Sequence, residues 1–261
     1  YAMYKREPIV LTTTLGYFSL MELLQAVTYS VVDQCGTPLN ESMTFLGYLH
    51  ITFQPFFINA VSLYFVAKEV RQKIGPAVYA VCGVSAVLLL LNIFPFAWAG
   101  KCDPHVREMC SDCLCSYYGR VHIAWKFPMN GMFNWMVLGN KHINAWLIYL
   151  IPAFLLPLIY GSWKMTLYHI LMGPVPARII TGSVEEMSAF WCLLSIMFLL
   201  IVVKTPVREY LFVDKWFWWQ RPPGEVHDQA RSREVRPGRG IGEALALDEL
   251  HRPDGLETPH H

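Results

Sequence analysis

Residues 187–203 read MSAFWCLLSIMFLLIVV, a run of seventeen positions without a charged side chain. A helix that crosses the roughly 30 Å hydrocarbon core of a bilayer needs about 20 mostly apolar residues. This run is therefore typical of a transmembrane helix.

Six further hydrophobic stretches are present, and the one at Val121–Leu138 is weaker than the others. It carries His122, Lys126 and Asn130, with Pro128 in the middle, and such a segment is tolerated at membrane depth only where protein or a water-filled cavity covers it. We therefore predict an all-α, polytopic transmembrane helical bundle of six to seven hydrophobic segments, the fourth of which re-enters the membrane or lies in its interface. The six stretches are Ile9–Val32, Met43–Val66, Pro76–Ala99, Val121–Leu138, Ile143–Tyr160 and Met165–Ile180.

The composition supports a membrane location. Of the 261 residues 54% are hydrophobic and only 16% are charged, and the mean hydropathy is +0.32. Soluble domains carry about a quarter charged residues, so this deficit indicates a lipid-facing surface. The bilayer is the expected partner, together with other membrane subunits as an option, and no basic patch on a soluble fold suggests nucleic acid.

Two regions are expected. Residues 1–206 form the bundle, with a cysteine-rich outer loop at 100–120. Residues 207–261 hold a tryptophan-rich interfacial anchor around Trp216 and an arginine-rich tail, because clustered Trp beside Arg suits the headgroup region.

Charge bias predicts the orientation. Lys5 and Arg6 precede the first hydrophobic stretch, and Lys68, Arg71 and Lys73 lie between the second and third. The positive-inside rule makes this side cytoplasmic. Six spans would also place the arginine-rich tail in the cytoplasm, whereas seven would place it outside, so we predict cytoplasmic termini and a periplasmic or luminal cysteine-rich loop.

Several polar residues fall within the predicted spans. Glu22 and Gln25 share one face of the first, and a carboxylate in lipid costs several kcal/mol unless it is protonated, paired or hydrated. His50, Gln54 and Asn59 add more polarity to the second span than packing requires, although each alone could bond neighbouring helices. The predicted ligand or proton site comprises Glu22, Gln25, His50, Gln54, Asn59 and Trp125.

A metal site is a second interpretation of the same region. Glu22, His50, His122 and His169 could bind a divalent transition metal. The spacing argues against it, because no two histidines stand on adjacent turns of one predicted helix. The cofactor therefore stays open.

Five of the seven cysteines fall on the outer side, where clusters usually oxidise to structural disulfides. An odd number leaves one thiol. The run Cys110-x-x-Cys113-x-Cys115 could instead bind a metal or exchange disulfides. The five disulfide candidates are Cys35, Cys102, Cys110, Cys113 and Cys115.

Several segments of residues 15–206 resemble a family of bacterial and viral multispan membrane proteins with no assigned activity. They are Leu20–Ala26, Asp33–Pro38, Thr44–Asn59, Leu114–Tyr117, His122–Trp125, Leu193–Ser195 and Val203–Pro206. The resemblance implies a multispan architecture and directs attention to Glu22, His50, Gln54 and His122. It implies no reaction.

Three functions fit these patterns. The first is handling of a solute, an ion or protons at the polar intramembrane site, alone or as a subunit of a membrane complex. The second is a membrane-embedded enzyme, either metal-dependent around Glu22 and the histidines or a thiol oxidoreductase at the Cys110–Cys115 loop. The third is an accessory structural subunit whose polar residues hold helices together.

Overall fold

The computed structural model describes residues 7–103, 108–133, 137–138, 141–142 and 145–222, and it is mostly helical (65%). The chain divides after Arg221, and the described residues up to that position form one compact unit.

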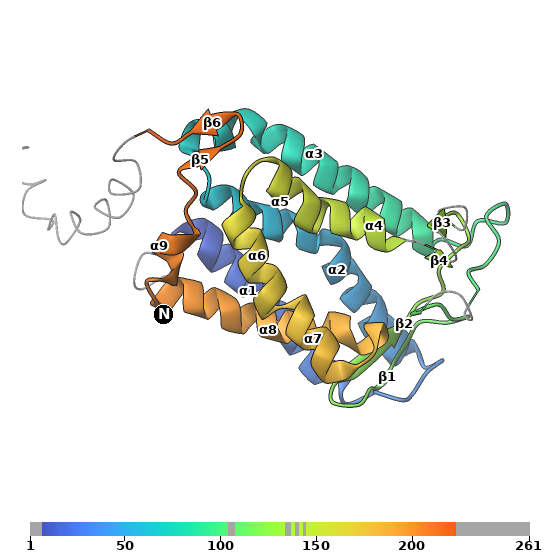
Figure 1. Cartoon of the computed structure of the whole chain (residues 1–261). Helices are drawn as coiled ribbons and strands as arrows, with labels where there is room; N and C mark the ends of the chain where they lie inside the picture. Colours follow the sequence, from blue (N-terminus) through green and yellow to red (C-terminus); the bar gives the residue numbers. More distant parts are fainter. Residues whose placement is uncertain (1–6, 104–107, 134–136, 139–140, 143–144, 223–261) are drawn as a thin grey trace, which may run out of the picture. The chain divides into compact units, whose positions relative to one another are not determined.

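Four of the predicted hydrophobic stretches are long helices in the structure. They are α1 (Ile9–Thr28), α2 (Pro38–Tyr64), α3 (Lys68–Ile93) and α8 (Val184–Lys204). Helix α1 packs against both α2 and α8, and α3 packs on the other side of α2 (Figure 1). Within the described residues α1, α3 and α8 are long and apolar enough to cross a membrane.

The stretch at 143–160 becomes a helix with a π-helical interruption. Helix α4 (Ala145–Leu150) continues through the π-helix η1 (Ile151–Leu155) into α5 (Leu156–Ile159). Pro152 has no N–H to donate to the carbonyl of Ile148. The Ser85 hydroxyl of α3 donates to that oxygen at 2.6 Å, so a neighbouring helix restores the lost hydrogen bond.

The stretch at 165–180 is broken as its sequence suggests. Helix α6 (Trp163–Met172) ends at Gly173, and α7 (Pro174–Thr181) begins directly after it. A Cβ atom on Gly173 would lie 2.5 Å from Nε1 of Trp191 on α8. A side chain at this position would therefore separate the break from α8.

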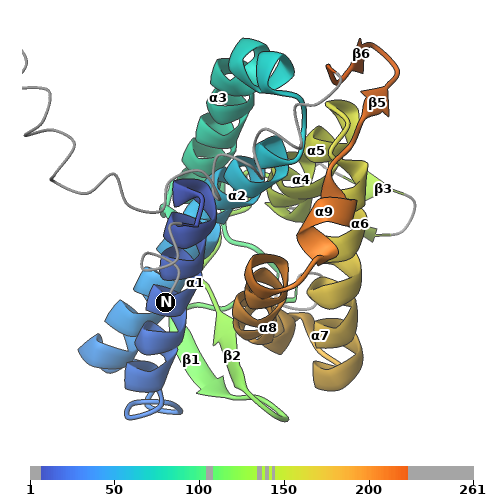
Figure 2. The same cartoon turned by 90° about the vertical axis from the view of Figure 1, so that its left-hand side faces the viewer.

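The fourth stretch is not a membrane helix, which corrects the all-α prediction. Strand β1 (Cys115–Tyr118) pairs antiparallel with β2 (Ile123–Lys126). Strand β1 packs against α2 and β2 packs against α8, and Figure 2 shows the hairpin at one end of the helices. Short strands flanked by polar turns carry too weak a periodic signal to distinguish them from a helix. Two-residue strand pairs follow at β3 (Val137–Leu138) with β4 (Lys141–His142), and at β5 (Lys215–Trp216) with β6 (Trp219–Gln220).

The predicted tryptophan-rich segment packs on the bundle after the short helix α9 (Val207–Leu211). The indoles of Trp216 and Trp219 donate to the carbonyls of Ile159 and Tyr160 at 3.1 and 3.0 Å, which satisfies oxygens at the end of α5.

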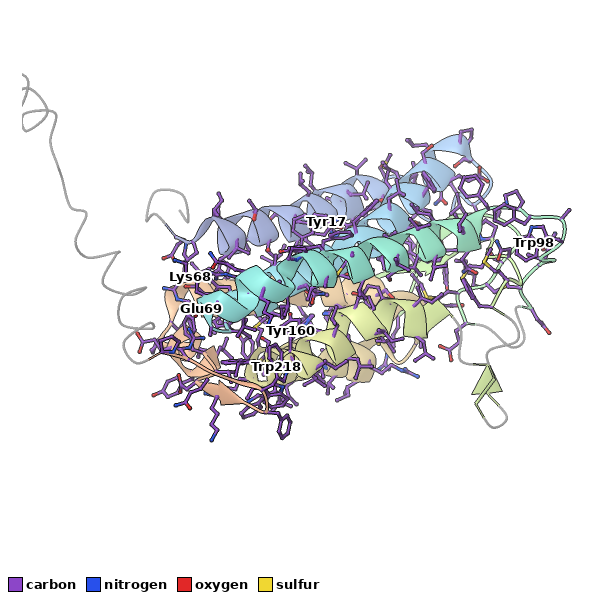
Figure 3. All side chains as sticks on the ribbon, turned by 90° about the horizontal axis from the view of Figure 1, so that it is seen from above. Tyr17, Lys68, Glu69, Trp98, Tyr160 and Trp218 are labelled. Atoms are coloured by element: carbon purple, nitrogen blue, oxygen red, sulfur yellow. A yellow bond between two sulfur atoms is a disulfide. The ribbon has the colours of Figure 1, made fainter. Side chains whose placement is uncertain are left out.

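Exposed indoles mark both ends of the bundle. Trp98 is 73% exposed at one end, and Trp218 is 51% exposed at the other, near Lys68 and Glu69 (Figure 3). Tryptophan is enriched at both interfaces of a membrane.

Candidate functional site

Helix α1 presents a half-buried carboxylate to the bundle. Glu22 Oε1 accepts from Nε2 of the buried Gln25 at 3.4 Å, and the same Nε2 lies 3.4 Å from the Ala189 carbonyl oxygen of α8. Gln25 Oε1 has no hydrogen-bond partner in the part of the chain that the structure describes. Glu22 forms no salt bridge with any described side chain. The acid therefore lies beside an amide whose oxygen has no partner among the described residues, and it has no countercharge there.

An aromatic stack joins α1 to α2 nearby. The ring of Tyr17 lies 3.9 Å from that of His50 and 3.7 Å from that of Phe57, between centroids, and both pairs are stacked. The Tyr17 hydroxyl donates to the backbone carbonyl of His50. Figure 3 shows Tyr17 midway along the bundle. Nε2 of His50 is buried and has no partner among the described residues, so the imidazole is held by stacking alone.

Gln54 is engaged by other helices. Its Oε1 accepts from the Tyr149 hydroxyl of α4 at 2.8 Å, and its Nε2 lies 4.0 Å from the Cys192 sulfur of α8. Both contacts link α2 to a neighbouring helix.

Asn59 is bonded at both ends of its amide. Nδ2 donates to the carbonyls of Pro55 and Pro152 at 2.8 and 2.7 Å, and Oδ1 accepts from the Tyr160 hydroxyl at 3.0 Å. These contacts satisfy a carbonyl of the π-helical turn. Asn59 therefore fixes the interrupted helix to α2.

The hairpin turn binds a carboxylate that is not among the predicted site residues. Glu186, 1% exposed, accepts from the backbone N–H groups of Arg120, Val121 and His122 at 2.9, 2.6 and 2.5 Å. Successive N–H groups that converge in this way form an anion-binding nest. A Cβ on Gly119 would lie 2.5 Å from the Glu186 carboxyl carbon, so the turn needs glycine there.

A sequence signal for Glu186 did exist. Ser183-Val-Glu-Glu186 has the Ser-x-x-Glu spacing of a capping box, and the Ser183 hydroxyl accepts from the Glu186 N–H at 3.3 Å. The motif locates the start of α8. It does not reveal that the carboxylate contacts the hairpin, because that contact depends on a turn more than 60 residues away in the sequence.

Strand β1 is bonded on its other side by a side chain. Asn40 of α2 donates to the Ser116 carbonyl at 2.8 Å and accepts from the Ser116 N–H at 3.0 Å. The amide thus replaces a neighbouring strand. Trp125 of β2 is buried, and a Cβ atom on Gly47 of α2 would lie 3.4 Å from its indole ring. We therefore assign Trp125 to the hydrophobic contact between hairpin and bundle.

His122 and His169 occupy separate positions. Nδ1 of His122 lies 2.6 Å from the Tyr29 hydroxyl, and burial lowers the pKa of His122, while the nearby Glu186 acts in the opposite direction. His169 of α6 accepts from Nε1 of Trp191 at 3.2 Å and is surrounded by aromatic rings. Among the residues that the structure describes, no three His, Cys, Asp or Glu side chains gather to hold a metal. The structure therefore does not support the predicted metal site at Glu22, His50, His122 and His169.

The outer cysteines are paired, as the disulfide interpretation predicts. Cys35 bonds Cys115 and Cys102 bonds Cys110, with Cα–Cα distances of 5.0 and 6.2 Å. Both lie in the range usual for disulfides. Cys113 is the thiol left over in this loop. The first bond ties the α1–α2 connection to the hairpin.

The sequence signature of a family of unknown function (DUF5765) matches residues 1–212. The chain belongs to this family. Membership agrees with the resemblance to an uncharacterised family, whereas the bacterial and viral range and the multispan architecture of that family stay predictions. No curated protein and no solved structure matches the chain significantly.

Proposed function

We propose that the protein is a multi-pass integral membrane protein that handles protons at Glu22. The apolar helices α1, α3 and α8 support a membrane location, as do the exposed indoles at both ends of the bundle. The disulfides fit an oxidising compartment at the hairpin end. The orientation follows from the charge bias, with cytoplasmic termini and the cysteine-rich loop in the periplasm or lumen.

The observation that carries the proposal is the unpaired acid on α1. Glu22 is half-buried on an apolar helix, and its printed hydrogen bond is a long one to Gln25. Ionisable residues within membrane helices mark proton or ion pathways by default, because their burial is costly. A single carboxylate beside an amide suits reversible protonation better than cation binding, which usually requires several oxygen ligands.

Buried polar atoms without a partner among the described residues also lie on α1 and on the neighbouring helix α2. Thr14 Oγ1, Gln25 Oε1 and His50 Nε2 are buried on α1 and α2 without a partner among the described residues. Each such atom costs about 1–3 kcal/mol when it stays unpaired. Water or a small polar solute would satisfy them, so these atoms are the proposed lining of the proton path.

Proteoliposomes with an entrapped pH-sensitive dye test the proposal. After a pH step, the wild type should collapse the gradient faster than protein-free vesicles, and Glu22→Gln should not. Glu209→Gln is the matched control, since Glu209 is exposed on α9. Equal rates for wild type, Glu22→Gln and empty vesicles would contradict proton handling.

An accessory structural role has one observation in its favour. Gln54 and Asn59, both predicted ligand residues, use their amides to bond other helices. Interhelical bonds of this kind stabilise membrane bundles by about 0.6–2 kcal/mol each. An accessory subunit would keep its fold and its partners after Glu22→Gln, which the same variant tests by co-purification.

A further inference from the structure

An apolar groove opens between two neighbouring rods of the bundle. One rod is α4–η1–α5 and the other is α6–α7, and they diverge from the loop that joins α5 to α6 (Figure 1). The groove has a volume of about 570 Å³, within the range of ligand sites in proteins. Nearly all of its surface is apolar, and its lining includes the aromatic side chains of Phe154 and Trp191.

The lining residues of the first rod follow a single helical face. Two series of side chains recur every four positions and lie side by side on this face. One is Leu147, Ile151 and Leu155, and the other is Leu150, Phe154 and Leu158. Ile151 and Leu155 are 41% and 49% exposed, so this row is open to the surroundings. Such a contiguous apolar face within a membrane is a surface for hydrocarbon.

One charged side chain borders the groove. Arg178 lies on α7 one turn after Val175, and both line the groove. The Arg178 side chain is exposed and makes no hydrogen bond or salt bridge to the described residues. A guanidinium is the side chain best suited to bidentate phosphate binding.

The chain direction places this charge at one end of the groove. Leu158 stands next to the α5–α6 connection, whereas Arg178 stands one turn before the end of α7, at the opposite end of that rod. Arginine near a helix end reaches toward the headgroup layer while its stem stays in the apolar region. The groove therefore has a cationic mouth and an apolar body.

We propose that this groove binds an anionic glycerophospholipid, with one acyl chain along α4–η1–α5 and the phosphate on Arg178. The proposal rests on the membrane location proposed above, but not on proton handling at Glu22. The shape and the single charge are complementary to such a lipid: hydrocarbon fills the apolar body, and the phosphate neutralises the arginine.

Native mass spectrometry of the delipidated full chain tests this proposal, with phosphatidylglycerol and phosphatidylcholine of identical acyl chains as probes. Wild type should bind phosphatidylglycerol more tightly. Arg178→Gln should raise its apparent Kd roughly tenfold and remove the preference, the factor that one charge-assisted hydrogen bond supplies. Arg120→Gln is the matched control, because it removes an exposed positive charge on the hairpin turn at a position outside the groove lining.

A second variant tests the groove itself. Val175→Trp should fill the groove and weaken both lipids, and a normal thermal midpoint would show that the fold is intact. Equal binding of the two lipids to wild type would overturn the proposal, as would an unchanged preference in Arg178→Gln. A dimer that disappears in Val175→Trp would assign the groove to a second copy of the chain instead.

Discussion

At the scale of single residues, Glu186 connects the hairpin to the bundle. Its carboxylate accepts three backbone N–H groups of the turn, and it is the residue at the third position of α8. A carboxylate satisfies three donors, whereas a carboxamide presents an NH2 group to some of them. The two acceptor oxygens therefore matter more than the size of this side chain.

We expect Glu186→Gln to destabilise the protein by about 1–3 kcal/mol, because at least one buried N–H loses its acceptor. The amides of Arg120, Val121 and His122 should exchange with deuterium faster than in the wild type. Hydrogen-exchange mass spectrometry of the turn peptide measures this directly. Glu69→Gln, at an exposed position of α3, should leave both stability and exchange unchanged. Unaltered exchange in Glu186→Gln would show that the turn amides do not depend on the Glu186 carboxylate.

His122 gives the hairpin end of the protein a pH dependence with a defined sign. Burial lowers its pKa in the folded protein, whereas in the unfolded chain it should titrate near about 6.5. The unfolded state therefore takes up a proton first as the pH falls. The stability that comes from neutral His122 is present above about pH 6.5 and is lost below it.

Thermal midpoints between pH 8 and pH 5 should therefore decline more steeply for wild type than for His122→Asn, which cannot titrate. Asparagine keeps a polar atom close to Nδ1, so the contact with the Tyr29 hydroxyl is preserved in kind. Parallel curves for the two proteins would mean that His122 does not control the pH response.

At the scale of elements, the sequence predicts the long helices and misses the hairpin. The runs around α1, α3 and α8 are apolar over about 20 residues, so their length alone identifies them. Strands β1 and β2 are four residues each, and their pairing is fixed by Asn40, Glu186 and the Cys35–Cys115 bond. Those partners are distant in sequence, and no local pattern reveals them.

The candidate site shows the same division. Intramembrane polarity correctly predicts burial of Gln25, Gln54 and Asn59. It does not say which amides are satisfied, because Gln54 bonds Tyr149 of α4, whereas Asn59 bonds Pro152 of η1 and Tyr160 directly after α5. The functional role of Glu22 stays a prediction.

The interrupted helix makes a prediction of its own. Pro152 frees the Ile148 carbonyl, and the Ser85 hydroxyl satisfies it at 2.6 Å. Ser85→Ala should destabilise the protein by about 0.6–2 kcal/mol. Ser42→Ala is the control, since the exposed Ser42 hydroxyl bonds within its own helix to the Pro38 carbonyl. Unfolding in mixed micelles compares the two variants. Equal unfolding midpoints would show that the hydrogen bond from Ser85 of α3 to the Ile148 carbonyl does not stabilise the protein.

At the scale of the whole molecule, the two ends of α3 should face different compartments. Lys73 is exposed near its start, and the helix runs about 30 Å further to Ile93, the thickness of a bilayer core. Cys113, the free thiol of the outer loop, lies beyond the other end of that helix. The remaining outer cysteines are in disulfides and do not react with maleimides.

A membrane-impermeant maleimide applied to intact cells should therefore label Cys113 in the wild type. Lys73→Cys combined with Cys113→Ser should be labelled only after the cells are permeabilised, because Cys82 and Cys192 are buried. Labelling of both positions in intact cells would contradict a membrane-spanning α3. The reverse pattern would keep the span but invert the orientation, and the lysines and arginines before α3 would then break the positive-inside rule. The disulfides decide between these outcomes on chemical grounds: a loop that holds two of them belongs in the oxidising compartment, so the accessible thiol should be Cys113.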